Sequence, residues 1–98
     1  MKIIFEVKDK TGRKLRMTDF NWNHILKRHP EMASSQDKIT ETLEKPDKIT
    51  DSLEDEDVKY YHKHYKNLPS PYKFIRIVAK YLNGDGFIIS SHFVKNIQ

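Results

Sequence analysis

The sequence contains no cysteine, only three glycines and no long hydrophobic run. The absence of cysteine excludes disulfides, thiol catalysis and thiolate metal sites, which leaves histidine, carboxylates, hydroxyls and cations for any chemistry. So few glycines provide no glycine-rich phosphate loop. No segment reaches the roughly 18 apolar residues that span a bilayer, and residues 1–10 become charged too early for a signal peptide. We therefore expect a cytoplasmic protein with no cofactor and no membrane partner.

Charge is unevenly distributed along the chain. Residues 1–30 carry eight cations and three anions, residues 31–57 three cations and ten anions, and residues 58–98 seven cations and one anion. The two basic stretches would form a polyanion-binding surface if they converged in space, although a mixed soluble surface has the same composition. Four adjacent anions at 54–57 predict an exposed turn. We expect the acidic segment 51–57 to lie away from any RNA-binding face, because its anions would repel phosphate.

The length of 98 residues suits one domain spanning 1–98, and the hydrophobic pattern predicts an α+β fold. Alternating apolar residues predict strands, while apolar residues at helical spacing beside capping residues predict helices. The expected elements are a hairpin over 3–17, a helix over 20–29, a second helix from 34 or 35 to 44, and strands over about 58–64, 72–81 and 87–93. We expect the hairpin and the two short helices to pack on a C-terminal antiparallel sheet of three to four strands.

In the last two expected strands, apolar residues alternate with polar or charged ones. Because successive side chains of a strand point to opposite faces, this alternation assigns each residue to one face of the sheet. The residues expected in the core are Ile75, Ile77, Ala79, Phe87, Ile89 and Phe93. The residues of opposite parity include Arg76, Lys80, Ser90 and His92. This pattern predicts one apolar face and one face with polar and cationic groups.

Residues 22–31 contain the most informative pattern for chemistry. On a helix, His24 and Arg28 are four residues apart and project from one face. An imidazole exchanges a proton near neutral pH, a guanidinium holds two phosphate oxygens, and a cation beside the imidazole lowers its pKa and favours its use as a base. The alternative is structural, with a histidine at the helix end and Arg28 paired with Glu31; His29 suits such a cap better than His24.

Residues 60–65 combine tyrosines with cations, a combination that holds unstacked bases beside phosphates. Ordinary packing of these tyrosines on the sheet is the alternative. His62 and His64 share one strand face, which permits a metal ion. A pair of histidines lacks the third and fourth ligands that zinc requires, so we expect no metal.

The last two strands offer further groups for a phosphodiester. Lys73, Arg76 and Lys80 can contact phosphate oxygens. Ser90 can orient a phosphate, and His92 can serve as a second proton-transfer group. The residues around Ser90 lack the glycine pattern of a nucleophile elbow, which argues against a serine hydrolase.

The chain also resembles a known group of nucleases. The residues that carry the resemblance are His24-Ile25-x-x-Arg28-His29-Pro30-Glu31, Ile39-x-x-Thr42-Leu43-x-x-Pro46-Asp47-x-Ile49, Tyr60-Tyr61 and Gly86-Phe87-Ile88-Ile89-Ser90. In this order they are similar to the phage-associated nucleases grouped with barnase, EndoU, the tRNA-cleaving colicins and RelE. The resemblance implies metal-independent RNA cleavage, with roles falling on His24, on Arg28 or His29, and on Ser90. Such families often have threonine followed by an aromatic residue where this chain has Ser90-Ser91-His92.

These observations lead to the hypothesis of a toxin-like endoribonuclease that cleaves RNA by attack of the 2′-hydroxyl on phosphorus. The assigned roles are base for His24, phosphate clamp for Arg28, acid for His29 or His92, phosphate orientation for Ser90, and strand binding for Tyr61, Lys73 and Arg76. The expected partners are RNA and a cognate antitoxin or immunity protein. The alternatives are a non-catalytic nucleic-acid- or protein-binding module on the same fold, and a small metalloenzyme that uses His62 and His64.

Overall fold

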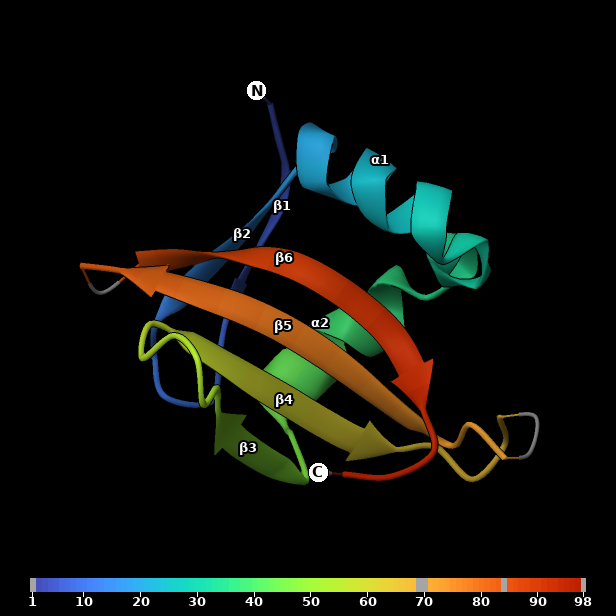
Figure 1. The fold of residues 1–98 in the computed structure, drawn as a ribbon. Helices are drawn as coiled ribbons and strands as arrows, with labels where there is room; N and C mark the ends of the chain where they lie inside the picture. Colours follow the sequence, from blue (N-terminus) through green and yellow to red (C-terminus); the bar gives the residue numbers. More distant parts are fainter. Residues whose placement is uncertain (1, 69–70, 84, 98) are drawn as a thin grey trace.

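The computed structural model describes residues 2–68, 71–83 and 85–97 (Figure 1). Its elements are the strands β1 (Ile3–Lys8), β2 (Lys14–Thr18), β3 (Lys48–Asp51), β4 (Val58–His64), β5 (Phe74–Leu82) and β6 (Asp85–Val94), the helices α1 (Asp19–Arg28) and α2 (Gln36–Glu44), and a 3₁₀ helix, η1 (Pro30–Ser34). The predicted α+β class is confirmed. Pro69, Ser70 and Gly84, which the sequence places in two turns, lie outside the described residues.

The sheet is larger and more mixed than the sequence predicts. Its six strands run in the order β1-β2-β6-β5-β4-β3, so the N-terminal hairpin is part of the sheet rather than packed on it. All neighbouring strands are antiparallel except β2 and β6, which pair in parallel from Lys14 opposite Asp85 to Arg16 opposite Phe87. The prediction of an antiparallel sheet of three to four strands is therefore wrong. It missed the pairing of β2 with β6 and of the short β3 with β4, which form only when the chain folds.

The close pairing of β6 with β5 at Gly86 depends on a glycine. A Cβ atom at Gly86 would lie 2.4 Å from the carbonyl oxygen of Lys80 and 2.9 Å from Cδ2 of Leu15. The carbonyl oxygen belongs to the backbone of β5, which cannot move aside as the leucine side chain on β2 can, so only glycine fits where β6 packs this closely on β5.

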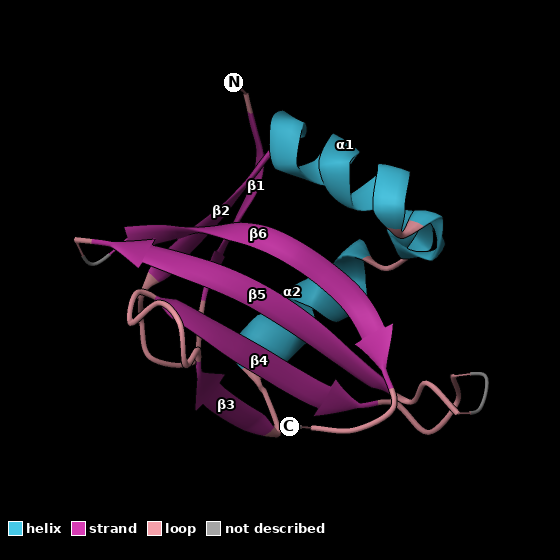
Figure 2. Cartoon of the chain, in the orientation of Figure 1, coloured by secondary structure: helices cyan, strands magenta, loops and turns pink. Residues whose placement is uncertain are grey.

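The helices occupy different positions relative to the sheet (Figures 1 and 2). The second helix, α2, lies behind the sheet, with Ile39 and Leu43 buried against it. The first helix begins at Thr18, whose side chain accepts a hydrogen bond from the Asn21 amide, and lies beside β6. The side chain of Asn21 donates to the carbonyl oxygen of Ile88, 3.1 Å away, and so satisfies an acceptor of β6. Within the described part of the chain, no helix is long and apolar enough to cross a membrane.

The core lies between α2, the 3₁₀ turn and one face of the sheet. The fully buried apolar side chains of the described residues are Leu15, Met17, Ile25, Met32, Ile39, Leu43, Tyr61, Ile75, Ile77, Ala79 and Ile88. The prediction that Ile75, Ile77 and Ala79 belong to the core is confirmed. The same prediction for Phe87 and Ile89 is wrong, since both side chains are only half-buried and Ile88 takes their place.

A β-bulge explains the inverted parity in β6. Val78 pairs with Ser90, but the next residue, Ala79, pairs with Ile88, so Ile89 is an extra residue in β6. Strand alternation therefore changes phase at Ile89. Figure 1 shows that β6 is curved. Two residues of β6 therefore lie opposite one residue of β5. A prediction that assumes strict alternation of side chains along a strand cannot anticipate such a bulge.

Ile77 provides a test of the core assignment. Its side chain is fully buried, so Ile77→Ala should lower the free energy of unfolding by about 2–5 kcal/mol. The adjacent change Val78→Ala, on the other face of the same strand, should cost distinctly less, because that side chain is only partly buried. Urea unfolding followed by circular dichroism measures both values. Equal losses for the two variants would contradict the assignment of the faces.

Candidate active site on the outer face of the sheet

The side of the sheet that faces away from α2 carries a row of nitrogen-containing side chains. We call it the outer face; the row consists of His62 on β4, Arg76 on β5 and His92 on β6. Arg76 is paired directly with both histidines in the sheet register. Directly paired residues of neighbouring strands project from the same face. The register therefore brings two imidazoles to the two sides of one guanidinium.

His62 is the most buried member of this row. Its side chain has no solvent exposure, and Nε2 accepts a hydrogen bond from Nε of Arg76 at 2.9 Å. An accepting Nε2 requires a neutral ring whose proton is on Nδ1, which has no hydrogen-bond partner among the described residues. Burial, followed by the charges of Arg76, His92 and Lys48, lowers the pKa of His62 to about 4. Near neutral pH this imidazole is therefore an acceptor that orients Arg76.

The depressed pKa of His62 predicts a pH-dependent stability. The unfolded imidazole takes up a proton near pH 6.5, whereas the native one does so only near pH 4. Stability is thus full above pH 6.5 and should fall by about 3 kcal/mol as the pH falls through this window. His62→Gln, which keeps an acceptor for Arg76, should have a flatter profile in urea unfolding between pH 7 and 4. Parallel profiles for the two proteins would show that His62 does not titrate in this way.

Arg76 has hydrogen-bonding capacity to spare. Its Nε atom is engaged by His62, and its guanidinium carbon lies 5.6 Å from the centre of the Tyr60 ring. Within residues 2–68, 71–83 and 85–97, its terminal amino groups have no protein acceptor. A guanidinium that is held at one edge and free at the other is suited to bind two oxygens of a phosphate.

His92 contacts a further histidine from the end of α1. The rings of His29 and His92 are stacked with their centres 5.0 Å apart, and Nδ1 of His29 lies 3.7 Å from a carboxylate oxygen of Glu31. Burial, followed by the charges of His29 and Arg76, lowers the pKa of His92, while Glu31 acts in the opposite direction. His29 also caps α1, as predicted, through its amide and the carbonyl oxygen of Ile25. We call His29, His62, Arg76 and His92 the histidine–arginine cluster.

His24 and Arg28 lie outside this cluster. Both side chains are exposed on α1, and no ion pair or hydrogen bond joins either of them to another described residue. They follow Phe20 and Asn21 along one side of the helix, because residues three or four apart share a side. They therefore lie on an exposed side of α1, whereas His29, at the end of the helix, contacts His92.

Three other predicted site residues have different surroundings. Ser90 lies on the outer face opposite Val78, on the same face as His92. Tyr61, expected at the RNA strand, is fully buried and donates from its hydroxyl to Asp9, so its ring has no surface for a base. Lys73 donates to the carbonyl oxygens of Lys66 and Leu68, at 3.1 and 2.9 Å, and so holds the loop after β4. Alternation along β4 explains the error for Tyr61, since its neighbour Tyr60 faces outward and partners Arg76.

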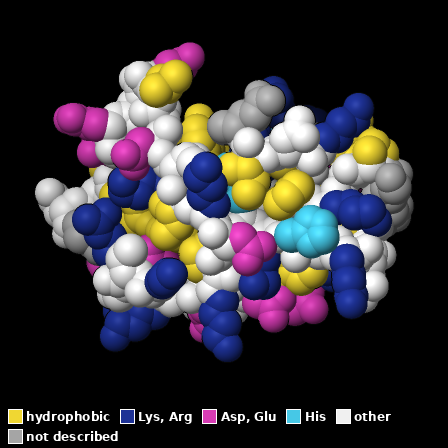
Figure 3. Space-filling model, turned by 90° about the horizontal axis from the view of Figure 1, so that it is seen from below, with side chains coloured by type: hydrophobic (Ala, Val, Ile, Leu, Met, Phe, Trp, Pro, Cys, Tyr) yellow, Lys and Arg dark blue, Asp and Glu magenta, His cyan; other side chains and the backbone are white. Residues whose placement is uncertain are grey.

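The acidic segment is closer to the outer face than its charge suggests. Asp55 lies 3.2 Å from the amino group of Lys80, which is on this face, and Asp51 pairs with Lys59. The chain reverses at residues 52–57 to enter β4, whose first residue pairs with Lys80. Asp55 therefore lies beside the outer face, and the expectation that this segment lies away from an RNA-binding face stays a prediction. Figure 3 shows one side of the molecule, where cationic, acidic and apolar side chains are mixed and histidine reaches the surface.

The histidines that the sequence offers for a metal ion do not form such a site in the part of the chain that the structure describes. Among the described residues, no three histidine or carboxylate side chains converge closely enough to hold one. His64 packs with its ring edge against Phe74 at 5.0 Å between centres, while His62 is engaged by Arg76. The two histidines considered for a metal site thus have separate surroundings.

No protein-family model, curated protein or solved structure matches the chain.

Proposed function

We propose that the chain is a metal-independent endoribonuclease of the toxin type, related to the barnase, EndoU, colicin and RelE nucleases that it resembles in sequence. The observation that supports this proposal is the histidine–arginine cluster. It combines the partly buried imidazole of His92, the guanidinium of Arg76 beside it in the sheet, and the imidazole of His29, which stacks on His92 from the end of α1. RNA cleavage needs a base, a cation for the phosphate and an acid, and these three groups supply them.

In the proposed reaction, His92 removes the proton from a 2′-hydroxyl, and its lowered pKa keeps it neutral and ready to accept near neutral pH. The 2′-oxygen forms a bond to the adjacent phosphorus, and the bond from phosphorus to the 5′-oxygen breaks. Arg76 binds the phosphate oxygens on which charge accumulates. His29 gives a proton to the departing 5′-oxygen. The products are a 2′,3′-cyclic phosphate and a 5′-hydroxyl.

Other residues of the outer face and of α1 take supporting roles in this proposal. His62 positions Arg76 through the hydrogen bond between Nε2 and Nε. Ser90 can contact the phosphate from the outer face, and Arg28 and His24 can contact the flanking strand from the exposed side of α1. A toxin of this kind requires a cognate antitoxin or immunity protein, which would cover the same face.

The experiment is an RNA cleavage assay in excess chelator with analysis of the product ends. We expect single-stranded RNA to be cut to cyclic phosphates, and we expect 2′-O-methylation at the cut position to block the reaction because it removes the nucleophile. Cleavage that requires a metal, or that leaves 3′-hydroxyl ends, would contradict the mechanism. Salt-dependent RNA binding with no cleavage would instead indicate the non-catalytic binding module.

A further inference from the structure

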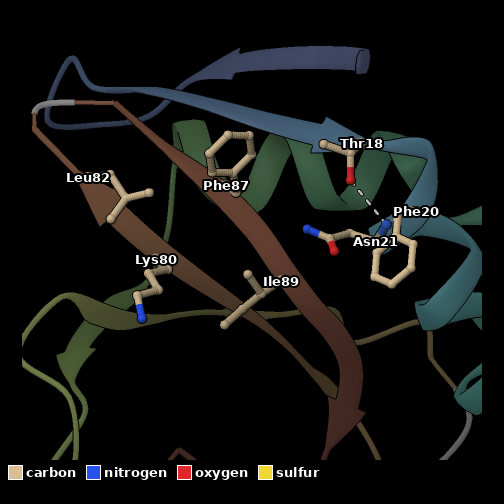
Figure 4. A pocket seen from close by; sticks show the side chains of 7 residues that line it. All are labelled: Thr18, Phe20, Asn21, Lys80, Leu82, Phe87 and Ile89. Atoms are coloured by element: carbon tan, nitrogen blue, oxygen red, sulfur yellow. Dashed lines mark hydrogen bonds between the residues drawn. The ribbon is translucent and has the colours of Figure 1, made fainter. Parts of the chain in front are cut away.

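A second feature of the outer face is an apolar pocket of about 560 Å³ between the start of α1 and the hairpin of β5 and β6 (Figure 4). We call it the phenylalanine pocket. Phe20 and Asn21 line it from α1, Phe87 and Ile89 from β6, and Lys80 and Leu82 from β5. Its volume is in the range of small-molecule sites. It lies at the opposite end of the outer face from the contact between His29 and His92.

The side chains of the pocket are unusually exposed for their type. Phe20 is 64% exposed and Leu82 is 49% exposed, although both are large and apolar. Neither is needed to fill the core, and Phe87 and Ile89 reach this face because the bulge turns them away from the core. Apolar groups that a fold leaves open in a concave site are commonly there to bind a partner or ligand.

The chemistry of the lining favours a nucleobase. Figure 4 shows rings from two different elements, Phe20 and Phe87, at the border of the pocket, and the carboxamide of Asn21 between them. Aromatic rings provide stacking surfaces for unpaired bases. The side-chain nitrogen of Asn21 donates a hydrogen bond to the carbonyl oxygen of Ile88. The side-chain oxygen of Asn21 is left as an acceptor. An acceptor suits the exocyclic amine of adenine, and the larger rings of a purine suit the two aromatic walls.

The pocket also lies on the same face of β5 as Arg76 of the cluster. Lys80, on its border, and Arg76 are four residues apart on one face of β5, which is about 13 Å at the rise of an extended strand. An extended single strand covers that distance in about two nucleotides. A strand whose phosphate binds Arg76 would therefore bring a nearby base to the pocket.

We propose that the phenylalanine pocket binds an unpaired adenine of the RNA, a subsite that rests on the ribonuclease function proposed above. Phe20 and Phe87 stack on the base, and the Asn21 oxygen accepts from its amine. The subsite selects where the strand is held, and the histidine–arginine cluster cleaves it about two nucleotides away.

The first test measures binding of a 2′-O-methylated oligonucleotide that has one adenine among uridines and cannot be cleaved. We expect Phe20→Ala and Phe20→Leu to weaken binding by about 5–150-fold, while Phe20→Trp retains it, because stacking on one base contributes about 1–3 kcal/mol. Phe20 is mostly exposed, so these variants should fold normally. The control is Leu53→Ala, a fully exposed apolar residue on the acidic segment, which should leave affinity unchanged. Full affinity in Phe20→Leu would overturn the proposal, because a merely apolar occupant such as a protein side chain would tolerate leucine.

The second test titrates adenosine monophosphate and follows the ring signals of Phe20 and Phe87 by NMR. We expect both rings to shift, and we expect the shifts to be lost in Phe20→Ala. If the rings respond but unmodified RNA is never cut, the subsite stands and the ribonuclease proposal fails. If RNA is cut in a manner that depends on His92 but neither ring responds, the cleavage site stands and the adenine subsite is wrong.

Discussion

Replacing His92 with glutamine is expected to lower the rate of RNA cleavage by about 10²–10⁴-fold, the usual contribution of a positioned acid or base. Glutamine keeps a polar side chain of similar length but cannot exchange a proton near neutral pH. RNA binding should change little, because in the proposed reaction Arg76 rather than the imidazole holds the phosphate. Single-turnover cleavage at saturating protein separates the loss of rate from any loss of affinity.

Two further histidine variants locate the base. His64→Gln should retain normal cleavage, since its ring packs against Phe74 away from the row. His24→Gln tests which histidine is the base: His24, as predicted from the sequence, or His92, as the contacts in the fold suggest. A small effect of His24→Gln on cleavage supports His92. The opposite result, with His24→Gln inactive and His92→Gln active, would move the base to the exposed side of α1 and contradict the assignment.

The pH dependence of cleavage gives an independent check on His92. Because burial and the charges of His29 and Arg76 lower its pKa, the acidic limb of the rate profile should lie below pH 6.5, the ordinary value for histidine. His62, whose pKa is about 4, remains neutral over the same range and should not contribute to that limb near neutral pH. A limb that lies above pH 6.5 would exclude His92 as the base.

Replacing Asp9 with alanine is expected to lower the free energy of unfolding by about 3–5 kcal/mol. Asp9 is 5% exposed in the turn between β1 and β2, and one of its oxygens accepts from the hydroxyls of Tyr61 and Tyr81. The other oxygen accepts from the amides of Thr11 and Arg13, each at 2.9 Å. Removing the carboxylate leaves two buried hydroxyls without an acceptor, at a cost of about 1–3 kcal/mol each.

A double-mutant cycle tests this explanation. Tyr61→Phe in the Asp9→Ala background should cost less than Tyr61→Phe in the parent, because the hydroxyl has already lost its acceptor. Asp51→Ala is the matched control, since Asp51 is 74% exposed and its pair with Lys59 should contribute at most about 1 kcal/mol. Urea unfolding measures all variants. Additive losses for Asp9 and Tyr61 would show that the hydrogen bond does not stabilise the fold.

Local pattern was sufficient for most of the elements. The bounds 58–64 predicted for β4 are those of the structure, and α1 differs from its predicted bounds by one residue at each end. These segments have strong apolar periodicity and clear capping residues, which act over a few residues of sequence. The short strand β3, by contrast, has four residues and exists through its pairing with β4. No local signal in so short a segment distinguishes a strand from a loop.

For the candidate site, the sequence identified the residue types and some of the members. His29, Arg76 and His92 were predicted for the site, whereas His62 was considered only for a metal. The pairing of His62 with Arg76 could have been found by counting registers from the loop between β4 and β5, since both residues have the parity of the outer face. Tyr61 and Lys73 were expected to contact RNA. The sequence alone does not show whether a tyrosine or lysine points to solvent or hydrogen-bonds to another part of the protein.

By itself the sequence determined the α+β class, the order of the elements, the half of the core that lies on β5, and a supply of histidines and cations with no thiol. Those properties depend on composition and on periodicity within one segment. Only the tertiary structure decided that the hairpin joins the sheet, that a bulge exchanges Ile88 for Phe87 and Ile89 in the core, and that His29 meets His92. Each of these depends on contacts between segments far apart in the chain, where register and local irregularity determine which side chains face one another.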